Sequence, residues 1–237
     1  MDHRTKNSLP IRGILLDVDG TLYRQPLLRI YIAIELLLSF CVHPKTTWQV
    51  IHIIRIFRKI RESLRDEGKT NYSLEHLQYE LVASQKKCSV NFVRKIINEW
   101  MFIRPIKYMR FCKRRGALKF LNWCSEKGIK IGAYSDYPTQ EKLTALGLNQ
   151  LFDLHLCSTD REINSFKPSS KGLLVALNKW KLKPVEVIYV GDREDVDGTA
   201  AMNAKMQFIK VGEKKDSAWM TVKNFKDLLN HMHHLKG

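Results

Sequence analysis

Three strongly hydrophobic segments of this chain each lead into an aspartate, and this feature most constrains how the chain can fold. They are the start of ILLDVDGTLY (14–23), IKIGAYSD (129–136) and VEVIYVGD (185–192). Weaker β-type segments span 151–158 and 206–212, and helical patterns fill the intervals at 117–128, 139–147, 169–180 and 198–205. Strands that alternate with helices form parallel βαβ units. The sequence therefore predicts an α/β fold, a Rossmann-like parallel sheet with helices on both faces.

The acidic ends of these strands are expected to lie close together. In parallel α/β sheets the functional site lies beyond the carboxyl ends of the strands, where Asp17 and Asp192 would meet. Neighbouring carboxylates repel each other unless a cation lies between them, and oxygen ligands suit Mg²⁺. No Cys/His set favours zinc. A phosphoryl group at that ion would need further donors, and Ser135, Lys167 and the backbone N–H groups after Asp17 are the candidates.

Composition limits the class of protein. The 237 residues are 44% hydrophobic, which is enough for a full core and argues against disorder. The five cysteines are scattered without a C-x-x-C pair, which suits a reducing compartment. Residues 1–13 are polar and lack the features of a secretory signal. We expect a cytoplasmic protein, with peripheral membrane association left open.

Positive charge is concentrated in one part of the chain. Residues 24–115 hold 19 Lys+Arg and 7 Asp+Glu, and so account for 12 of the 16 net positive charges. This segment has a helical pattern throughout, unlike the alternating pattern on either side. We therefore predict that residues 24–112 form an inserted, all-helical, basic cap. Residues 1–23 and 113–237 would form the α/β core.

Four motifs in order resemble those of the haloacid dehalogenase-like (HAD) hydrolase superfamily. They are DVDGT at 17–21, Ser135 after a hydrophobic strand, Lys167 followed by Pro168, and GDREDVD at 191–197. The order and the structural context of all four make the match specific. The resemblance implies the same α/β core, and the position of the basic segment is similar to that of the family's helical cap.

The resemblance also implies catalytic roles. Asp17 resembles the nucleophile that forms an aspartyl-phosphate, and Asp19 the general acid and base, which needs a pKa near the working pH. Gly20 and Thr21 fit the turn and the phosphate-binding loop that follow. Members that dehalogenate carbon typically lack the second aspartate, so the phosphatase branch is favoured over dehalogenation.

The remaining site residues follow from the same motifs. The metal ligands would be Asp17, Asp19, Asp192 and a second acid of the last motif, for which Asp197 is favoured and Asp195 is the alternative. Ser135, Asp136 and Lys167 complete the phosphate-binding set with Gly20 and Thr21. We also expect Asp136 to cap the helix that starts near Thr139, and we prefer this role to catalysis.

Three segments of the cap allow more than one interpretation. Residues 27–42 are apolar, but at 16 residues with Arg29 and Glu35 they fall short of a membrane span, so a buried helix is expected. Residues 46–68 are predicted to form a basic amphipathic helix, with Thr46 or Thr47 as its N-cap. This helix would either pack in the cap or lie on an anionic membrane surface, and packing in the cap is favoured. In 102–116, Pro105 is expected to end a helix near a hinge. The HMHH sequence at 231–234 is interpreted as a helix end rather than a metal site.

Two classes of function remain. The first is a Mg²⁺-dependent phosphatase that hydrolyses a phosphate monoester of an anionic small molecule. The second is a binding protein that uses the basic segment on a membrane surface or nucleic acid, with the core as scaffold or secondary activity. Nucleic acid is disfavoured because no recognition motif accompanies the charge. The sequence leaves the substrate and the oligomeric state open.

Overall fold

A six-stranded parallel sheet organises the protein. The computed structural model describes residues 11–67, 72–213 and 220–234. The strand order in the sheet is β3-β2-β1-β4-β5-β6, with every pair parallel. The strands are β1 (Gly13–Leu16), β2 (Lys130–Ser135), β3 (Leu154–Cys157), β4 (Val187–Gly191), β5 (Gln207–Val211) and β6 (Met220–Val222). The predicted parallel α/β sheet is confirmed, and β6 is a strand that the sequence analysis did not predict.

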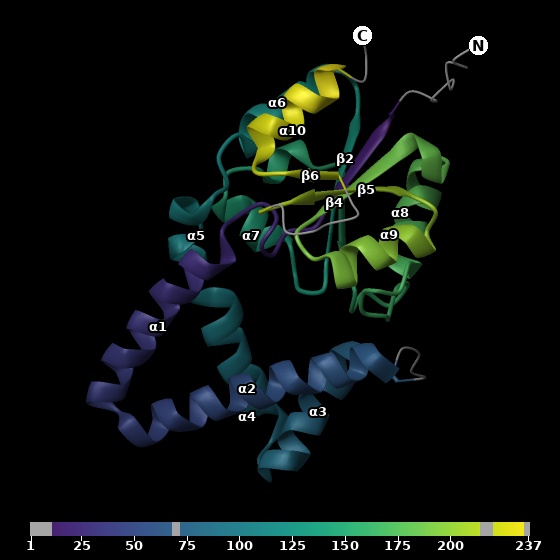
Figure 1. Ribbon diagram of the computed structural model, residues 1–237. Coiled ribbons are helices and arrows are strands. Elements are labelled where there is room, and N and C mark those ends of the chain that lie inside the picture. The colour runs from purple at the N-terminus through teal and green to yellow at the C-terminus, as the bar shows by residue number, and fades with distance from the viewer. Residues whose placement is uncertain (1–10, 68–71, 214–219, 235–237) are drawn as a thin grey trace, which may run out of the picture.

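Helices cover both faces of the sheet (Figure 1). The core helices are α6 (Ala117–Glu126), α7 (Gln140–Ala145), α8 (Lys171–Trp180), α9 (Thr199–Asn203) and α10 (Phe225–His234), and the short turns are η2 (Asn149–Leu151), η3 (Pro184–Glu186) and η4 (Glu194–Gly198). Ile14 and Leu16 contribute to one hydrophobic cluster with residues of α6, α7 and α10, and Leu15 to another with residues of α8 and α9. Successive strand residues point to opposite faces, so this alternation shows that β1 is buried on both sides.

The chain between β1 and α6 forms a group of helices beside the sheet (Figure 1). It consists of α1 (Gln25–Val42), α2 (Pro44–Glu67), α3 (Leu74–Lys86), α4 (Val90–Ile97), the π-helix η1 (Asn98–Ile103) and α5 (Ile106–Cys112). Helices α2, α3, α4 and η1 share a hydrophobic cluster of their own, which includes Phe57, Val82 and Ile97. This is the helical cap that the sequence predicts.

The two connections between cap and sheet lie next to each other. Tyr23 and Lys113 form an isolated antiparallel bridge, and the backbone N–H of Arg24 donates to the Cys112 carbonyl at 2.8 Å. The predicted boundaries, between residues 23 and 24 and between residues 112 and 113, lie between this bridge and this hydrogen bond. The division stays a prediction, because α5 just before it also contacts α7 of the core.

The expectation that the apolar helix at 27–42 is buried is wrong. The structure describes all of α1, and Leu28 is its one buried residue. The helix has 18 residues and a mean hydropathy of 1.6, so by length and composition alone it could cross a membrane. The exposure of α1 could not be deduced from its composition, because a buried apolar helix and an exposed one have the same sequence pattern.

The ends of three helices can be compared with the local signals in the sequence. Helix α2 begins at Pro44, so Thr46 and Thr47 lie within its first turn and neither is the N-cap. Proline is favoured in this first turn because it has no N–H to leave unpaired. Pro105 lies between η1 and α5, as predicted. The HMHH segment is the end of α10, and the side chains of its last two histidines lie outside the described residues.

Candidate active site

Asp17 lies at the carboxyl end of the central strand β1. Its backbone N–H donates to the Val190 carbonyl at 2.8 Å, which aligns the end of β1 with that of β4. The side chain is 3% exposed, and its two oxygens accept from Lys167 Nζ at 2.7 Å and Thr21 Oγ1 at 2.9 Å. The first and third motifs of the sequence therefore meet at one carboxylate.

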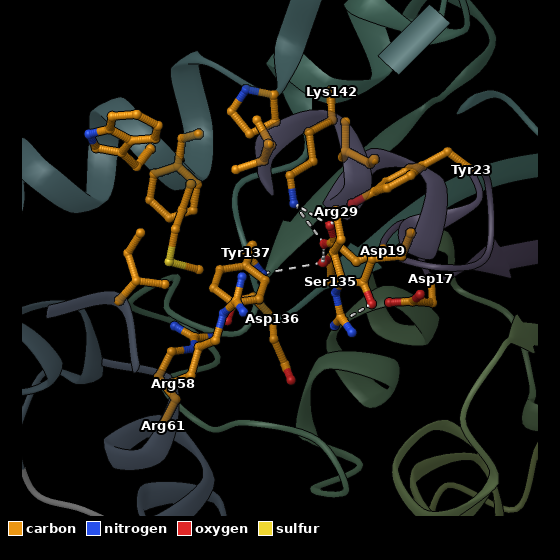
Figure 2. A pocket seen from close by; sticks show the side chains of 18 of the residues that line it. Asp17, Asp19, Tyr23, Arg29, Arg58, Arg61, Ser135, Asp136, Tyr137 and Lys142 are labelled. Atoms are coloured by element: carbon orange, nitrogen blue, oxygen red, sulfur yellow. Dashed lines mark hydrogen bonds and ion pairs between the residues drawn. The ribbon is translucent and has the colours of Figure 1, made fainter. Parts of the chain in front are cut away.

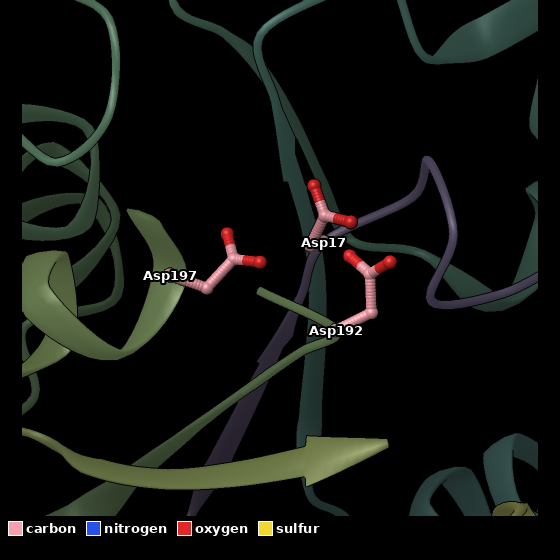
Figure 3. A group of neighbouring side chains, drawn as sticks. All are labelled: Asp17, Asp192 and Asp197. Carbon is pink, nitrogen blue, oxygen red and sulfur yellow. The ribbon is translucent and has the colours of Figure 1, made fainter. Parts of the chain in front are cut away.

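Three carboxylates point toward one another at this edge of the sheet (Figure 3). Asp17, Asp192 and Asp197 each offer an oxygen, and these atoms lie within 4.8 Å of one another. Asp197 is buried on the π-turn η4, whereas the side chain of Asp195 is 68% exposed and paired with Arg193. The structure thus brings Asp197, rather than Asp195, to the other two aspartates.

The electrostatics of this group fit a bound cation. Burial, reinforced by repulsion from Asp197 and Asp192, raises the pKa of Asp17 well above its usual value despite the opposing effect of Lys167. Burial and repulsion from Asp197 likewise raise the pKa of Asp192 to about 6. Both shifts mean that negative charge is undercompensated there. An all-oxygen site of this kind suits Mg²⁺, and these three residues would hold it.

Lys167 is the buried cation of the site. Its ammonium group donates to Asp17 Oδ1 and to Asp197 Oδ1, each at 2.7 Å, and to the Tyr189 hydroxyl at 3.2 Å. Burial alone would lower its pKa, but Asp17 and Asp197 raise it well above the usual value. Lys167 therefore remains charged, which is the state needed to bind a phosphate oxygen.

Asp19 has a different environment from Asp17. Its carboxylate accepts from Lys142 Nζ at 2.6 and 2.7 Å and from Ser135 Oγ at 2.8 Å, and it also accepts from the Tyr23 hydroxyl (Figure 2). Burial raises its pKa, but Lys142 and these hydrogen bonds outweigh burial and lower it. This geometry differs from two expectations. Asp19 was expected among the metal ligands, but its carboxylate is not part of the group of three aspartates. Its pKa was expected near the working pH, but it is lowered.

Two glycines allow the strands to approach this closely. Gly20 has a φ of 92°, and a Cβ there would lie 2.1 Å from Asp192 Oδ2. A Cβ at Gly191 would lie 2.6 Å from the Asp197 carboxylate. A side chain at either position would displace an aspartate of the site. Sterics therefore explain why glycine occupies positions 20 and 191.

Asp136 connects the site to the cap instead of capping a helix. Its carboxylate accepts from Ser158 Oγ at 2.5 Å and Arg65 at 2.7 Å, and its backbone carbonyl accepts from Arg61 at 2.6 Å. Helix α7 starts after Thr139 without a side-chain cap, so the predicted capping role is wrong. An ionised carboxylate repels phosphate, so any direct phosphate contact of Asp136 would have to come from its backbone.

Arg61 strengthens the same connection. It is 4% exposed, and its guanidinium lies 4.0 Å from the ring centre of Tyr137 and 4.2 Å from that of Phe166. Both rings belong to the core side of the site, whereas Arg61 is on α2 of the cap. Cation–π contacts of a buried arginine are energetically significant. Together Arg61 and Arg65 hold α2 against the loop after β2.

Substitution of Asp136 by asparagine is expected to destabilise the protein in a pH-dependent way. Burial raises the pKa of Asp136, but Lys167, Arg61 and Arg65 outweigh it and lower the pKa. Its ionised form therefore stabilises the fold above the unfolded pKa of about 4, and this contribution is lost as the pH falls through the folded pKa. We expect the free energy of unfolding to fall by about 3 kcal/mol at neutral pH.

Thermal melts of both proteins across the acid range test this. The difference in Tm should be large at neutral pH and shrink below about pH 4. Asp66→Asn changes an exposed aspartate on the same helix as Arg65 and should leave Tm nearly unchanged. A Tm difference independent of pH would show that the charge of Asp136 is not what stabilises the contact.

A cavity of about 470 Å³ opens over the aspartates, between core and cap. One end holds the polar site, and α1, α2 and η1 contribute apolar side chains to the wall, with Ile32, Leu36 and Ile54 among them. Arg29, Arg55 and Arg58 also line it, and none forms an ion pair with a carboxylate that the structure describes. The cavity can therefore accept an anionic molecule with a carbon skeleton.

Four residues of the site were not found from the sequence. Lys142, Tyr23, Arg61 and Arg65 belong to no motif, and each has the pattern of an ordinary helix or loop residue. Their partners are 4 to 123 positions away along the chain. Only the folded arrangement shows that they bind Asp19 and Asp136.

The chain matches proteins of known family along most of its length. The haloacid dehalogenase-like hydrolase family model matches residues 11–205. A glyceraldehyde 3-phosphate phosphatase of Methanocaldococcus jannaschii is 28% identical over 87% of this chain and 88% of its own. A protein of the same name from Methanopyrus kandleri is 34% identical, over 38% of this chain and 39% of its own.

The fold agrees with this match. A magnesium-bound HAD hydrolase of Bacillus subtilis superposes with a TM-score of 0.65 over 95% of this chain and 100% of its own, at 12% identity. At that identity the superposition supports the fold alone. The family match, however, includes all four motifs up to Asp197. The chain therefore belongs to the haloacid dehalogenase-like hydrolase family.

Proposed function

We propose that this protein is a Mg²⁺-dependent phosphatase that hydrolyses a phosphate monoester of an anionic small molecule through an aspartyl-phosphate on Asp17. The observation that carries the proposal is that Asp17, Asp192, Asp197 and Lys167 meet at one edge of the sheet, where Asp19 also binds Ser135. The relatives named glyceraldehyde 3-phosphate phosphatase support the reaction class.

In the first step, an oxygen of Asp17 would attack phosphorus as the bond to the leaving oxygen breaks. Lys167 and Ser135 would donate to phosphate oxygens that become more negative in the transition state. The negative charge of the bound phosphate would raise the pKa of Asp19, and the protonated Asp19 would give its proton to the leaving oxygen. A bound Mg²⁺ would neutralise charge on the carboxylates and the phosphate.

In the second step, water would attack the phosphorus of the aspartyl-phosphate while Asp19 takes its proton. The bond between phosphorus and the Asp17 oxygen breaks, which regenerates the Asp17 carboxylate and releases inorganic phosphate. Lys142 holds the Asp19 carboxylate in place at 2.6 and 2.7 Å, which orients the base for this step. The ion pair with Lys142 favours the carboxylate form, which the second step requires.

The cavity suggests what the rest of the substrate carries. Arg29, Arg55 and Arg58 would bind a second anionic group, such as a carboxylate or another phosphate. The apolar wall would contact the carbon skeleton. The presence of Asp19 supports phosphate-ester hydrolysis over dehalogenation, because a halide leaving group needs no acid.

Removal of divalent metal is expected to abolish phosphatase activity, and Mg²⁺ should restore it. The metal would also stabilise the folded protein, by about 2.7 kcal/mol at a hundredfold excess over Kd. We therefore expect Mg²⁺ to raise Tm of the EDTA-treated protein. Asp192→Asn should lose most of this rise, because it removes one of the three oxygen ligands.

Asp195→Asn is the matched control, since it removes an exposed carboxylate from the same loop. It should keep both the Mg²⁺-induced rise in Tm and the release of phosphate from an aryl phosphate. Full activity of the wild-type protein in EDTA would contradict the proposed metal dependence. A panel of phosphorylated metabolites, measured by phosphate release, would then identify the substrate.

A further inference from the structure

Helix α1 carries an uncovered apolar face. Leu37 and Leu38 are 64% and 62% exposed, and Ile30 and Ile34 lie on the same side at helical spacing. Val42, the last residue of α1, and Trp48 of α2 are exposed as well. Single exposed hydrophobic residues are ordinary, but a row of several along one helix face indicates an interaction surface.

The other side of α1 already has its partners. Leu28 is part of the core cluster, and Ile32 and Leu36 line the cavity over the aspartates. The exposed row is therefore not needed for packing or for the cavity. Its retention in water is unfavourable, so something outside the described chain is expected to cover it.

The charge around this face indicates the chemistry of its partner. Residues 25–61 contain six Lys+Arg and one acid, Glu35, which is already paired with Arg104 and Lys107. Lys45 and Lys59 are exposed and form no ion pair with a carboxylate of the described residues. A second copy of this chain would bring the same positive charge and be repelled. An anionic lipid surface is complementary both to the apolar row and to the cations.

The connections of α1 determine its orientation. Its first residue follows the active-site loop, and α2 returns from its far end until Arg65 reaches Asp136 at 2.7 Å. The start of α1 and the end of α2 therefore lie on the same side of any membrane. If α1 crossed the membrane, α2 would have to cross back, but among the described residues only α1 is apolar enough to span. Figure 1 shows the corner between α1 and α2 pointing away from the sheet. A helix held in this way lies along a membrane surface and does not cross it.

We propose that the exposed face of α1, with the corner that leads into α2, docks the protein on the surface of an anionic membrane. The leucines and Trp48 enter the boundary between headgroups and acyl chains, and the nearby lysines contact the lipid phosphates. The active-site cavity lies on the opposite side of α1, so docking leaves the aspartates free to bind substrate.

Vesicle flotation tests the proposal with the full-length protein. It should bind vesicles of phosphatidylcholine and phosphatidylglycerol, and bind phosphatidylcholine vesicles weakly. Leu37→Gln/Leu38→Gln should reduce binding by on the order of tenfold for each leucine withdrawn from the lipid. Leu118→Gln/Leu174→Gln changes two exposed leucines of the core and should bind like the wild type. Phosphatase activity without vesicles should be the same in all three.

Trp48 gives an independent signal. Of the four tryptophans that the structure describes, Trp48 is 54% exposed and the other three are buried. Its emission should shift to shorter wavelength on anionic vesicles, and Trp48→Phe should lose the shift. Equal binding to both vesicle types, or equal binding by the two double variants, would overturn the proposal. So would a dimer that dissociates in Leu37→Gln/Leu38→Gln without any vesicle binding.

Discussion

Asp17→Asn is expected to lower kcat by about four orders of magnitude or more, with the fold retained. The amide has nearly the same shape as the carboxylate but cannot form the aspartyl-phosphate. Asp17 is also part of the group of three aspartates, so the substitution weakens metal binding as well. Loss of the nucleophile and weaker metal binding both slow the same reaction. No neighbouring carboxylate that the structure describes is placed to take over either role.

The measurement is release of phosphate from an aryl phosphate, together with acid quenching to trap the phosphorylated enzyme. Wild-type protein should yield a trapped phosphoprotein, and Asp17→Asn none. Asp195→Asn supplies the matched control, because it makes the same chemical change at an exposed aspartate paired with Arg193. Substantial turnover by Asp17→Asn would exclude Asp17 as the nucleophile.

Asp19→Asn is expected to give a loss of about 10²- to 10⁴-fold in kcat, with a different signature. The nucleophile and the aspartates near it remain, so an aryl phosphate with a good leaving group can still phosphorylate Asp17. Activation of water in the second step is lost. The phosphorylated enzyme should therefore accumulate, which intact-protein mass spectrometry detects as the addition of one phosphoryl group.

Leaving-group dependence sharpens this result. An alkyl phosphate needs protonation of its leaving oxygen more than an aryl phosphate does, so its first step should be slowed more. Tyr23→Phe removes one hydrogen bond to Asp19 and keeps the carboxylate. It should cost only on the order of tenfold. If Asp19→Asn hydrolysed alkyl phosphates as fast as the wild type, Asp19 would not be the acid.

Much of the core was accessible from the sequence because its signals are local. A short continuous apolar run and the glycine after Asp19 specify β1 and the turn beyond it without reference to the rest of the chain. Parallel strands then force their carboxyl ends to one edge, so Asp17 and Asp192 had to be close together. The spacing of the last motif also favoured Asp197, which the structure places with them.

The cap was less predictable because its helices have similar patterns whether they face protein, water or lipid. The apolar helix α1 was expected to be buried and is exposed. Asp136 was expected to cap α7, but Arg65 and Ser158, which are distant in sequence, bind its carboxylate. A local hydrogen bond can be anticipated from neighbouring residues, whereas an ion pair between cap and core depends on how the two pack.

The sequence by itself determined the parallel sheet, the helical insertion and the identity of the residues at the strand ends, since these depend on periodicity and on short motifs. The tertiary structure alone decided the environments of those residues. Burial and Asp197 raise the pKa of Asp192, Lys142 lowers that of Asp19, and α1 leaves an apolar face uncovered. Desolvation and charge interactions depend on distances in space, and residues far apart in the chain acquire those distances only when it folds.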